Sequence, residues 1–401
     1  MSGDALPLSG RRVVLGVTGS IAAYKAADLA SKLRQAGADV EVVMTPAATQ
    51  FISPLTFQSL TGRPVVVDMF AAAEPEAHVE IARRADLYVI APATADCLAN
   101  LAHGQTPDMV TLTALATAAP VVVAPAMDSQ MWEHPATQAN IATLRARGVL
   151  CIGPGEGRLA SGRSGAGRLA ETAELMGAVR AALGQRDGDL VGRHVVVTAG
   201  GTQEPLDPVR YIGNRSSGKM GFAIAEAARD RGAQVTLVTG PVTLETPYGV
   251  QRVQVTTVAD LVVALDKVAP DADAIVMAAA PGDFRPDAVS DQKIKKADGE
   301  DAMVVRLVKN PDVIGTLRGG GVRVGFAAET ENLAANAVEK LGRKRLHFIV
   351  GNDVTKEGSG FGTDTNQVTF FHADGRVEEM PLMSKYAVAC AILDRVKARL
   401  G

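Results

Sequence analysis

The sequence is poor in cysteine: its 401 residues contain Cys97, Cys151 and Cys390. Three widely spaced thiols do not suggest a disulfide framework or a cysteine-based zinc site. The formal net charge of -3 gives no basic excess, which argues against nucleic acid as a partner. No apolar run approaches the ~18 residues of a membrane span, and the first residues lack the apolar core of a signal peptide. We therefore expect a cytoplasmic protein that binds neither nucleic acid nor membrane.

The chain has the composition of a globular protein with large cores, since 47% of its residues are hydrophobic and 21% are charged. Its length exceeds the roughly 100–200 residues of one domain, so two domains are expected. Segments with helical periodicity alternate with short apolar runs, and the segment 21–37 ends on the helix-ending Gly37. This alternation predicts a doubly wound parallel sheet. The apolar runs of the first half are residues 12–17, 39–45, 86–92, 120–126 and 148–153.

The segment AALGQRDGDLVGR, residues 181–193, breaks this alternation and is predicted to be a linker. We therefore expect domains at 1–182 and 190–401. A second α/β pattern follows, with predicted strands at 194–201, 234–240, 272–280, 322–330 and 346–353.

The end of the chain has a different pattern. A β-hairpin is expected around Asp374-Gly375, followed by a helix from Ser384 to Leu400 that Ser384 caps. The fold class is therefore α/β with two doubly wound domains. The first is flavodoxin-like or Rossmann-like, and the second is Rossmann-like with an added hairpin.

The stretch GNRSSGKM, residues 213–220, nearly matches the phosphate-binding pattern G-x-x-x-x-G-K-[ST]. Met220 replaces the hydroxyl that would bind magnesium, and the preceding strand ends a dozen residues earlier. We predict a helix that begins near Ser217 and runs to Gly232, with an anion at its N-terminus. A damaged P-loop and a plain glycine-rich helix start are the alternatives.

Seven ordered motifs of the second half are GGTQEPLDPVRYIGNRSSGKMG, AAAPGDFRP, KIKK, KNPDVI, FAAET, GNDV and GFGTDTN. Together they resemble the phosphopantothenate–cysteine ligase domain of coenzyme A biosynthesis. The resemblance implies that CTP, with Mg²⁺, activates 4′-phosphopantothenate as an acyl-cytidylate with release of pyrophosphate. The amino group of cysteine then displaces CMP.

The resemblance also implies roles for individual residues. Asn214 would handle the acyl-cytidylate, Asp283 would contact the nucleotide, and Phe326 would pack beside the base or the pantetheine chain. A core aromatic is the alternative for Phe326. Phosphate contacts are expected from Lys293 of KIKK above all, for which a solvated basic loop is the alternative, and from Lys309, Lys340 and Lys344.

The first half contains GVTGSIAAYK, which follows the first predicted strand and opens a helix. Gly19 and Ser20 can therefore place backbone N–H groups and a hydroxyl around one phosphate. The dinucleotide pattern G-x-G-x-x-G is absent, so a mononucleotide is favoured over NAD.

Three further motifs are MTPAATQFISPLTFQSLTGRPV, AHVEIARRADLYVIAPATAD and APAMDSQMW. They resemble the homo-oligomeric flavin-containing cysteine decarboxylases, in which a neighbouring subunit of a trimer completes the FMN site. His78 matches the catalytic histidine of that family, and imidazole suits proton transfer near neutral pH. In isolation, a surface histidine before a helix would be the alternative. The resemblance further implies that Ser20, Thr45 and Ser53 hold the phosphate and ribityl chain of FMN, and that Thr94 and Asp96 lie near the flavin.

Two positions depart from this family's pattern. The substrate-binding motif P-x-M-N-x-x-M-W is retained at Met131, but Asp128 replaces the amide and would repel a substrate carboxylate. Ser161 stands where many relatives carry the cysteine that protonates the enethiol intermediate, and a hydroxyl is a poorer acid than a thiol. Cys151 is near in sequence, but nothing in the sequence shows that it could substitute.

These patterns together predict a bifunctional ligase and decarboxylase that makes 4′-phosphopantetheine from 4′-phosphopantothenate, cysteine and CTP. One alternative is a ligase whose flavoprotein half mainly serves oligomerisation. Another is a flavin-binding regulatory protein without catalysis. Trimers of the flavoprotein domain and dimers of the ligase domain would combine into a dodecamer.

Overall fold

The computed structural model describes residues 6–69, 76–295, 303–319, 321–329, 333–353, 355, 358–360 and 362–401. It divides the chain into two compact units, Ala5–Arg186 and Asp187–Gly401, apart from the first four residues. The division falls within the segment predicted to be the linker. Four residues of the motifs quoted above lie outside the described residues, namely Lys296, Thr330, Val354 and Phe361.

The N-terminal unit is built on a six-stranded sheet in the order β3-β2-β1-β4-β5-β6. All of its strand pairs are parallel. Five of the strands coincide with the predicted apolar runs, because strands covered on both faces must be apolar throughout. The bounds are β1 Arg12–Val17, β2 Asp39–Met44, β3 Val65–Val66, β4 Leu87–Ala93, β5 Val121–Pro125 and β6 Leu150–Cys151.

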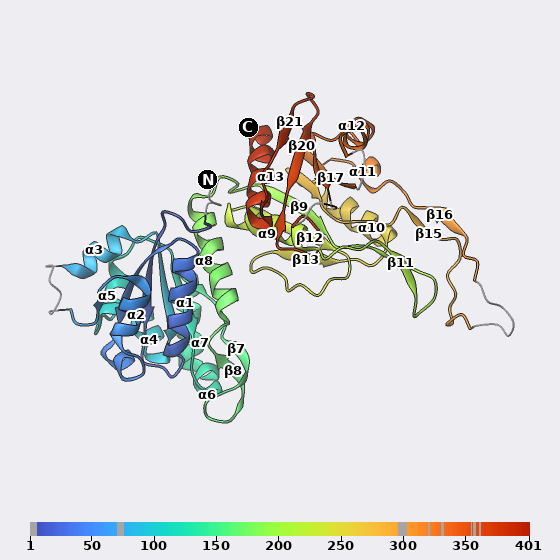
Figure 1. Cartoon of the computed structure of the whole chain (residues 1–401). Coiled ribbons are helices and arrows are strands. Elements are labelled where there is room, and N and C mark those ends of the chain that lie inside the picture. The colour runs from blue at the N-terminus through green and yellow to red at the C-terminus, as the bar shows by residue number, and fades with distance from the viewer. Residues whose placement is uncertain are drawn as a thin grey trace. The chain divides into compact units, whose positions relative to one another are not determined.

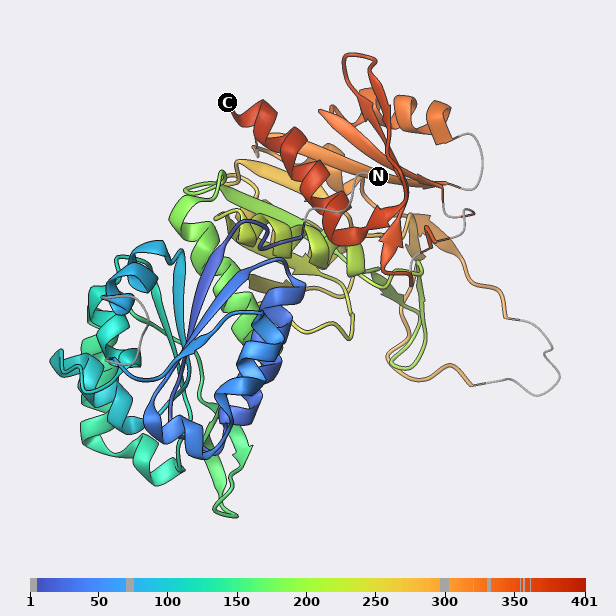
Figure 2. The same cartoon turned by 60° about the vertical axis from the view of Figure 1, so that its left-hand side comes forward.

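Helices cover both faces of this sheet (Figures 1 and 2). Helix α1 ends just before Gly37, whose φ of 95° is the left-handed conformation expected after a helix. The helical bounds are α1 Ala23–Gln35, η1 Pro46–Gln50, α2 Pro54–Thr61, α3 Ala77–Arg84, α4 Ala95–His103, α5 Met109–Ala116, α6 Ser129–Glu133, α7 Pro135–Ala146 and α8 Thr172–Asp187.

Helix α8 corrects the predicted linker, whose first seven residues are helical rather than irregular. Ala182 and Leu183 are buried in this last part of the helix, and Gly184 is buried with them. Burial of these apolar residues outweighs the roughly 1 kcal/mol that a glycine costs in a helix.

An antiparallel hairpin, β7 Gly155–Arg158 and β8 Ser164–Arg168, precedes α8. Its backbone lies against the chain that follows β5. Met127 N–H donates to Gly167 O at 2.9 Å, and a Cβ on Gly167 would lie 2.3 Å from Met127 O. Glycine at 167 therefore allows the hairpin to pack directly on the residues after β5.

The C-terminal unit contains an eight-stranded sheet in the order β13-β12-β9-β14-β17-β18-β20-β21. The first six strands are parallel, and β20 and β21 add an antiparallel hairpin. The second doubly wound domain and its hairpin around Asp374-Gly375 are therefore confirmed. The bounds are β9 His194–Ala199, β12 Gln234–Thr239, β13 Gln251–Gln254, β14 Ala274–Met277, β17 Val322–Glu329, β18 Phe348–Asp353, β20 Val368–His372 and β21 Val377–Glu379.

The helices of this unit include α13, which the Ser384 side chain caps by accepting Ala387 N–H at 3.1 Å, as predicted. Helix α9 begins at Lys219, two residues after the predicted start. Figure 1 shows α9 and α13 beside each other, and they pack on the same sheet. The bounds are α9 Lys219–Asp230, α10 Val258–Val268, α11 Val313–Thr316, α12 Leu333–Arg343 and α13 Lys385–Leu400.

Three short ribbons were not predicted, since strands of two or three residues carry too little alternation to recognise. They are β10 Gln203–Pro205 with β11 Tyr211–Gly213, β15 Phe284–Pro286 with β16 Leu307–Lys309, and β19 Thr365–Asn366 with β22 Met383–Ser384. Both views show that residues 287–295, which follow β15, and residues 303–306, which precede β16, extend away from the sheet of their unit (Figures 1 and 2). Within the described part of the chain, no helix is long and apolar enough to cross a membrane.

Candidate active sites

The carboxyl edge of the N-terminal sheet carries a series of helix starts. Thr45, Ser53 and Thr94 are the N-caps of η1, α2 and α4, and each hydroxyl accepts a backbone N–H of the first turn. Thr45 N–H donates to Val17 O at 3.0 Å, and Thr94 N–H donates to Thr18 Oγ1 at 3.2 Å. These contacts join the ends of β1, β2 and β4. Because helix N-termini favour anions, this edge suits a phosphorylated ligand.

The loop between β1 and α1 packs closely against the loop after β2. Ser20 Oγ accepts Ala22 N–H at 3.2 Å at the start of α1. A Cβ on Gly19 would lie 2.6 Å from the Cβ of Ala47, so a larger residue would push the two loops apart. Gly19 and Ser20 thus lie between two helix starts, and the Ser20 hydroxyl can donate its proton to an anion there. These residues fit the phosphate of a mononucleotide such as FMN.

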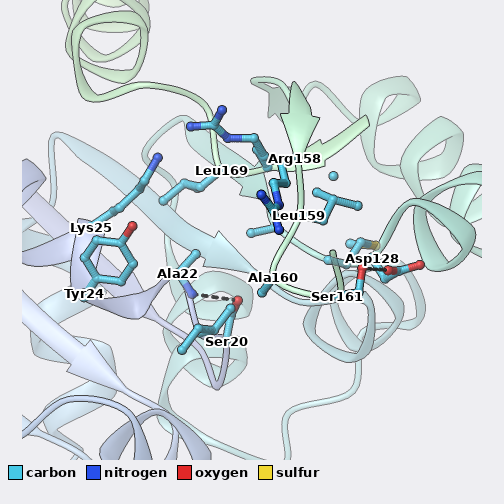
Figure 3. A pocket seen from close by; sticks show the side chains of 15 residues that line it. Ser20, Ala22, Tyr24, Lys25, Asp128, Arg158, Leu159, Ala160, Ser161 and Leu169 are labelled. Carbon is cyan, nitrogen blue, oxygen red and sulfur yellow. Dashed lines mark hydrogen bonds between the residues drawn. The ribbon is translucent and has the colours of Figure 1, made fainter. Parts of the chain in front are cut away.

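A cavity of about 580 Å³ lies between the start of α1, the end of β5 and the β7–β8 hairpin. Figure 3 shows Lys25 and Tyr24 on one side of the view, with Asp128 and Ser161 on the other. The structure therefore brings together Ser20, Asp128 and Ser161, which the sequence predicts as separate site residues. The remaining lining residues are Ile21, Ala22, Ala126, Met127, Arg158, Leu159, Ala160, Gly167, Arg168 and Leu169.

The carboxylate of Asp128 has three partners. As N-cap of α6 it accepts Gln130 N–H at 3.0 Å on Oδ1. Its Oδ2 accepts the Ser161 hydroxyl at 2.6 Å, and Arg163 Nη1 lies 3.4 Å from Oδ1. The hydrogen bond from Ser161, followed by that from Gln130 and the charge of Arg163, holds the pKa of Asp128 below its ordinary value. Asp128 is therefore ionised at neutral pH, and the Ser161 hydroxyl donates its hydrogen bond to the Asp128 carboxylate.

Other predicted residues of this unit lie outside the described lining of the cavity. His78 is half-buried in the first turn of α3. Asp96 is exposed in the first turn of α4 and accepts Asn100 Nδ2 at 3.2 Å. Met131 lies on α6 with 49% exposure. Cys151 is half-buried in β6, and burial raises the pKa of its thiol. Within one chain, His78 and Met131 therefore do not line this cavity, although Met131 lies on the helix that Asp128 caps.

The second site lies where the strand order of the C-terminal sheet reverses, between β9 and β14, a common position for ligands in such folds. Gly201 bridges Ala280, and Ala280 N–H donates to Gly200 O at 2.8 Å. A Cβ on Gly201 would lie 2.5 Å from Asn214 O. Asn214 Nδ2 donates to Pro281 O at 3.0 Å. These contacts hold Asn214 beside the carboxyl ends of β9 and β14.

A cavity of about 240 Å³ opens next to this point. Five predicted residues line it, namely Asp283, Lys309, Phe326, Lys340 and Lys344. Lys309 is exposed, and the other lining residues are Met277, Ala279, Pro281, Gly282, Asn310, Pro311, Asp312, Val313, Ile314 and Arg343. Pro281 belongs both to this lining and to the contact with Asn214, so the predicted ligase residues gather at one edge of the sheet.

Two of the cavity's lysines already have partners. Lys340 Nζ donates to Phe326 O at 2.6 Å, and Lys344 Nζ pairs with Asp312 Oδ1 at 2.9 Å. Burial alone would raise the pKa of Asp312, but the ammonium of Lys344 outweighs burial and the pKa lies below its ordinary value. A phosphate in the cavity would therefore meet two ammonium groups held in place by neighbouring oxygens.

Asn310 is a site residue that the sequence reasoning missed, although it lies in the quoted motif KNPDVI. It is 7% exposed, and its N–H donates to Asp283 O at 2.8 Å. Its Nδ2 donates to Gly282 O at 2.9 Å, and its Oδ1 accepts Arg285 Nη1 at 3.1 Å. Asn310 therefore fixes the loop that carries Asp283. The signal available in the sequence was its position in that motif, directly after the predicted Lys309.

Lys293 does not reach this cavity within one chain, since it is exposed on the extended segment between β15 and β16. An ion pair between the buried Asp207 and the partly exposed Arg210 holds the adjacent Ile294. Asp207 accepts Arg210 Nε at 2.9 Å and Nη2 at 2.6 Å. Ile294 N–H donates to Asp207 Oδ2 at 3.1 Å, while Arg210 Nη2 donates to Ile294 O at 3.0 Å. The Arg210 hydrogen bond first, and then the backbone donors, keep the pKa of Asp207 well below its ordinary value.

The stretch 213–220 does not form a P-loop. Strand β9 ends at Ala199, and β10 and β11 intervene before α9. Lys219 Nζ donates to Gly362 O at 2.8 Å and pairs with Asp364 Oδ1 at 2.7 Å. Ser216 Oγ accepts Gly218 N–H at 3.3 Å. The prediction of a helix start in place of a Walker loop is confirmed, while anion binding there stays a prediction.

The described residues hold no group of three or more His, Cys, Asp or Glu side chains that could bind a metal ion. Magnesium prefers phosphate oxygens and water with one or two carboxylates, so a site made jointly with a nucleotide would not require such a group.

The two doubly wound sheets, each with a cavity beside the carboxyl ends of its strands, define a two-domain α/β protein suited to phosphorylated ligands. Residues 4–184 match the sequence profile of the Flavoprotein family. Residues 190–400 match the profile described as the DNA/pantothenate metabolism flavoprotein C-terminal domain.

Full-length relatives agree with both matches. The chain is 43% identical over 400 residues to the coenzyme A biosynthesis bifunctional protein CoaBC of Vibrio vulnificus strain YJ016, covering 98% of this chain and 99% of the relative. It is 44% identical over 398 residues to the protein of the same name from Bacillus subtilis, covering 98% of each. The chain belongs to this family of bifunctional coenzyme A biosynthesis enzymes, which carry a ligase domain and a decarboxylase domain.

Two solved structures are similar to the separate halves. The C-terminal domain of a coenzyme A biosynthesis bifunctional protein is 36% identical, with a TM-score of 0.46, covering 53% of this chain and 98% of that one. A PPC decarboxylase mutant complexed with pantothenoylaminoethenethiol is 32% identical, with a TM-score of 0.39, covering 42% of this chain and 96% of that one.

Proposed function

We propose that the C-terminal unit ligates 4′-phosphopantothenate to cysteine with CTP and Mg²⁺, and that the N-terminal unit decarboxylates the product to 4′-phosphopantetheine with FMN. The principal support is the C-terminal cavity, where Asp283, Phe326 and the lysines Lys340 and Lys344 converge from three separate segments of the chain. Such convergence at the switch point of a doubly wound sheet is expected of a nucleotide site.

In the ligation, Lys340 and Lys344 neutralise charge on the triphosphate from the wall of the cavity. Asp283, held by Asn310, contacts the nucleotide, and Phe326 packs beside an apolar part of a substrate. Asn214 lies next to Pro281, where it orients the acyl-cytidylate for attack by the amine. Lys293 contributes a phosphate contact from the extended segment. The backbone of the adjacent Ile294 is hydrogen-bonded to Asp207 and Arg210, which holds this part of the segment in place.

In the decarboxylation, Gly19, Ser20, Thr45 and Ser53 bind the phosphate and ribityl chain of FMN, while Thr94 and Asp96 lie near the ring. Bound FMN supplies reversible hydride transfer, which makes the substrate an electron acceptor for loss of CO₂ and then restores its oxidation level. His78 takes a proton from the substrate, and Met131 contacts the substrate. Because His78 and Met131 lie outside the cavity of their own chain, a trimer in which a neighbouring subunit completes each site fits this arrangement.

A direct experiment tests both halves of the proposal. We expect the purified protein to show a flavin spectrum and to release pyrophosphate from CTP when 4′-phosphopantothenate is present. Addition of cysteine should give the ligated product and then CO₂. A yellow protein without pyrophosphate release would indicate a regulatory flavoprotein. Pyrophosphate release and ligation without CO₂ would indicate a ligase with a flavoprotein scaffold. We further propose trimers of flavoprotein domains and dimers of ligase domains, combined as a dodecamer in the cytoplasm.

The Ser161→Cys variant tests whether this chain lacks an efficient acid for its second half-reaction. We expect wild-type protein to return slowly to oxidised flavin under anaerobic conditions, because an alcohol beside ionised Asp128 is a weak acid. A thiol of reference pKa about 8.5 should accelerate this step by about 10-fold or more. Stopped-flow flavin absorbance with phosphopantothenoylcysteine measures the step, while the first reduction should keep its rate.

Cys151→Ala is the matched control for Ser161→Cys, since burial raises the pKa of that thiol and it lies outside the described cavity lining. Its reoxidation rate should equal that of wild type. Rapid wild-type reoxidation that Ser161→Cys leaves unaltered and Cys151→Ala removes would assign the proton to Cys151 instead.

A further inference from the structure

Two backbone hydrogen bonds close the tip of the β7–β8 hairpin, which lies next to the start of α6. Leu159 N–H donates to Arg163 O at 2.7 Å, and Gly162 N–H donates to Leu159 O at 2.9 Å. A Cβ on Gly165 would lie 3.0 Å from the Cβ of Ser129, so the hairpin approaches the start of α6 closely. The side chains of Ser161 and Arg163 therefore lie next to the carboxylate of Asp128 because of how the hairpin backbone is held.

Asp128 is the single acidic side chain among the described residues that line the 580 Å³ cavity, which also has Lys25, Arg158 and Arg168. A substrate with a phosphate at one end and a carboxylate at the other would find cations for the phosphate along this lining. Its carboxylate, at the opposite end, would meet the ionised Asp128. Like charges a few ångströms apart cost binding free energy unless a cation offsets them.

Arg163 is placed to offset that charge. Its Nη1 lies 3.4 Å from Asp128 Oδ1, and its side chain is 52% exposed, so the ion pair is partly open to solvent. A guanidinium carries five N–H donors, and this contact engages one nitrogen. Ser161 occupies the other carboxylate oxygen of Asp128 at 2.6 Å. Asp128, Ser161 and Arg163 therefore form one cluster without net charge, at the end of the cavity next to α6.

We propose that Arg163 is a specificity-determining residue of the decarboxylase site, which offsets the charge of Asp128 and so allows the carboxylate of the substrate to bind beside it. This inference rests on the proposed function. Arg163 acts through Asp128 from outside the cavity lining, which makes it a positioning residue and not a catalytic one. A surface ion pair without any role in binding is the competing explanation.

Two ligands that differ in the carboxylate distinguish these explanations. One is 4′-phosphopantothenoylserine, which keeps the carboxylate but has a hydroxyl in place of the reactive thiol. The other is 4′-phosphopantetheine, which lacks the carboxylate and keeps the thiol, so each variant is compared with wild type separately for each ligand. Each is titrated into the flavin-loaded full-length protein, and the change in flavin absorbance reports binding without turnover.

Arg163→Gln should weaken binding of the serine ligand by about fivefold, the factor that corresponds to an exposed ion pair. Binding of 4′-phosphopantetheine should change by less than about twofold, because no carboxylate is present to be repelled. Adding Asp128→Asn to Arg163→Gln should restore the affinity for the serine ligand. Arg34→Gln, which removes the same charge at the far end of α1, should leave both affinities unchanged.

Equal weakening of both ligands, no weakening of either, or no recovery in the double variant would overturn this role of Arg163. A wild-type protein that contains flavin but binds neither ligand would instead refute the proposed decarboxylase function. Flavin content measured for every variant separates loss of substrate binding from loss of the folded site.

Discussion

Replacing His78 by Asn should abolish CO₂ release from phosphopantothenoylcysteine while CTP-dependent ligation continues at its normal rate. Asparagine keeps part of the shape of imidazole but cannot take a proton near neutral pH. Loss of a general base lowers rates by about 10²–10⁴-fold. Ligation should survive because His78 lies in the N-terminal unit and the ligase cavity lies in the C-terminal unit. Distant changes of this kind usually have independent effects. Captured CO₂ and released pyrophosphate measure the two activities in one preparation.

His103→Asn is the matched control, since His103 is exposed in the last turn of α4 on the same unit. It should leave both activities unchanged. If His78→Asn also stopped ligation, the two sites would not be separable as proposed, or the oligomer would couple them. Normal CO₂ release in His78→Asn would remove His78 from the mechanism.

The sheets were predictable because a parallel strand covered on both faces must be apolar along its whole length. Runs such as Arg12–Val17 and His194–Ala199 satisfy this condition and formed strands at the predicted positions. The linker was predicted less well, because a glycine and several polar residues concealed the helical burial of Leu183. The ribbons were missed because two or three residues per strand provide too little alternation to recognise.

The site residues also differ in how far the sequence could predict them. Ser20 could be proposed from the sequence because it follows the first predicted strand and precedes a helix, and the carboxyl ends of parallel strands share one edge. Asp283 was proposed only because its motif resembles that of the ligase family. Asn310 and Arg163 act through hydrogen bonds across loops, and these contacts depend on how a hairpin folds back rather than on any local pattern. His78 and Lys293 do not line the cavities of their own chain, and no local pattern in the sequence indicated this.

An Asn214→Asp variant should form the acyl-cytidylate but fail to convert it to the amide. Asn214 Nδ2 donates to Pro281 O at 3.0 Å, and an ionised carboxylate would lose this bond and face the carbonyl oxygen. The new negative charge would also repel the phosphate of the activated intermediate, which must stay aligned for attack by cysteine. We expect about one pyrophosphate per active site in a burst, followed by a ligation rate reduced by about 10²-fold or more.

Rapid-quench measurement of pyrophosphate, together with mass measurement of the bound intermediate, tests Asn214→Asp directly. Gln234→Glu makes the same change from amide to acid at the start of β12, at the opposite edge of the sheet, and should behave as wild type. Normal amide formation in Asn214→Asp would exclude this residue from the second step. Loss of the pyrophosphate burst would place Asn214 in the activation step instead, where its contact with Pro281 would shape the nucleotide cavity that Pro281 lines.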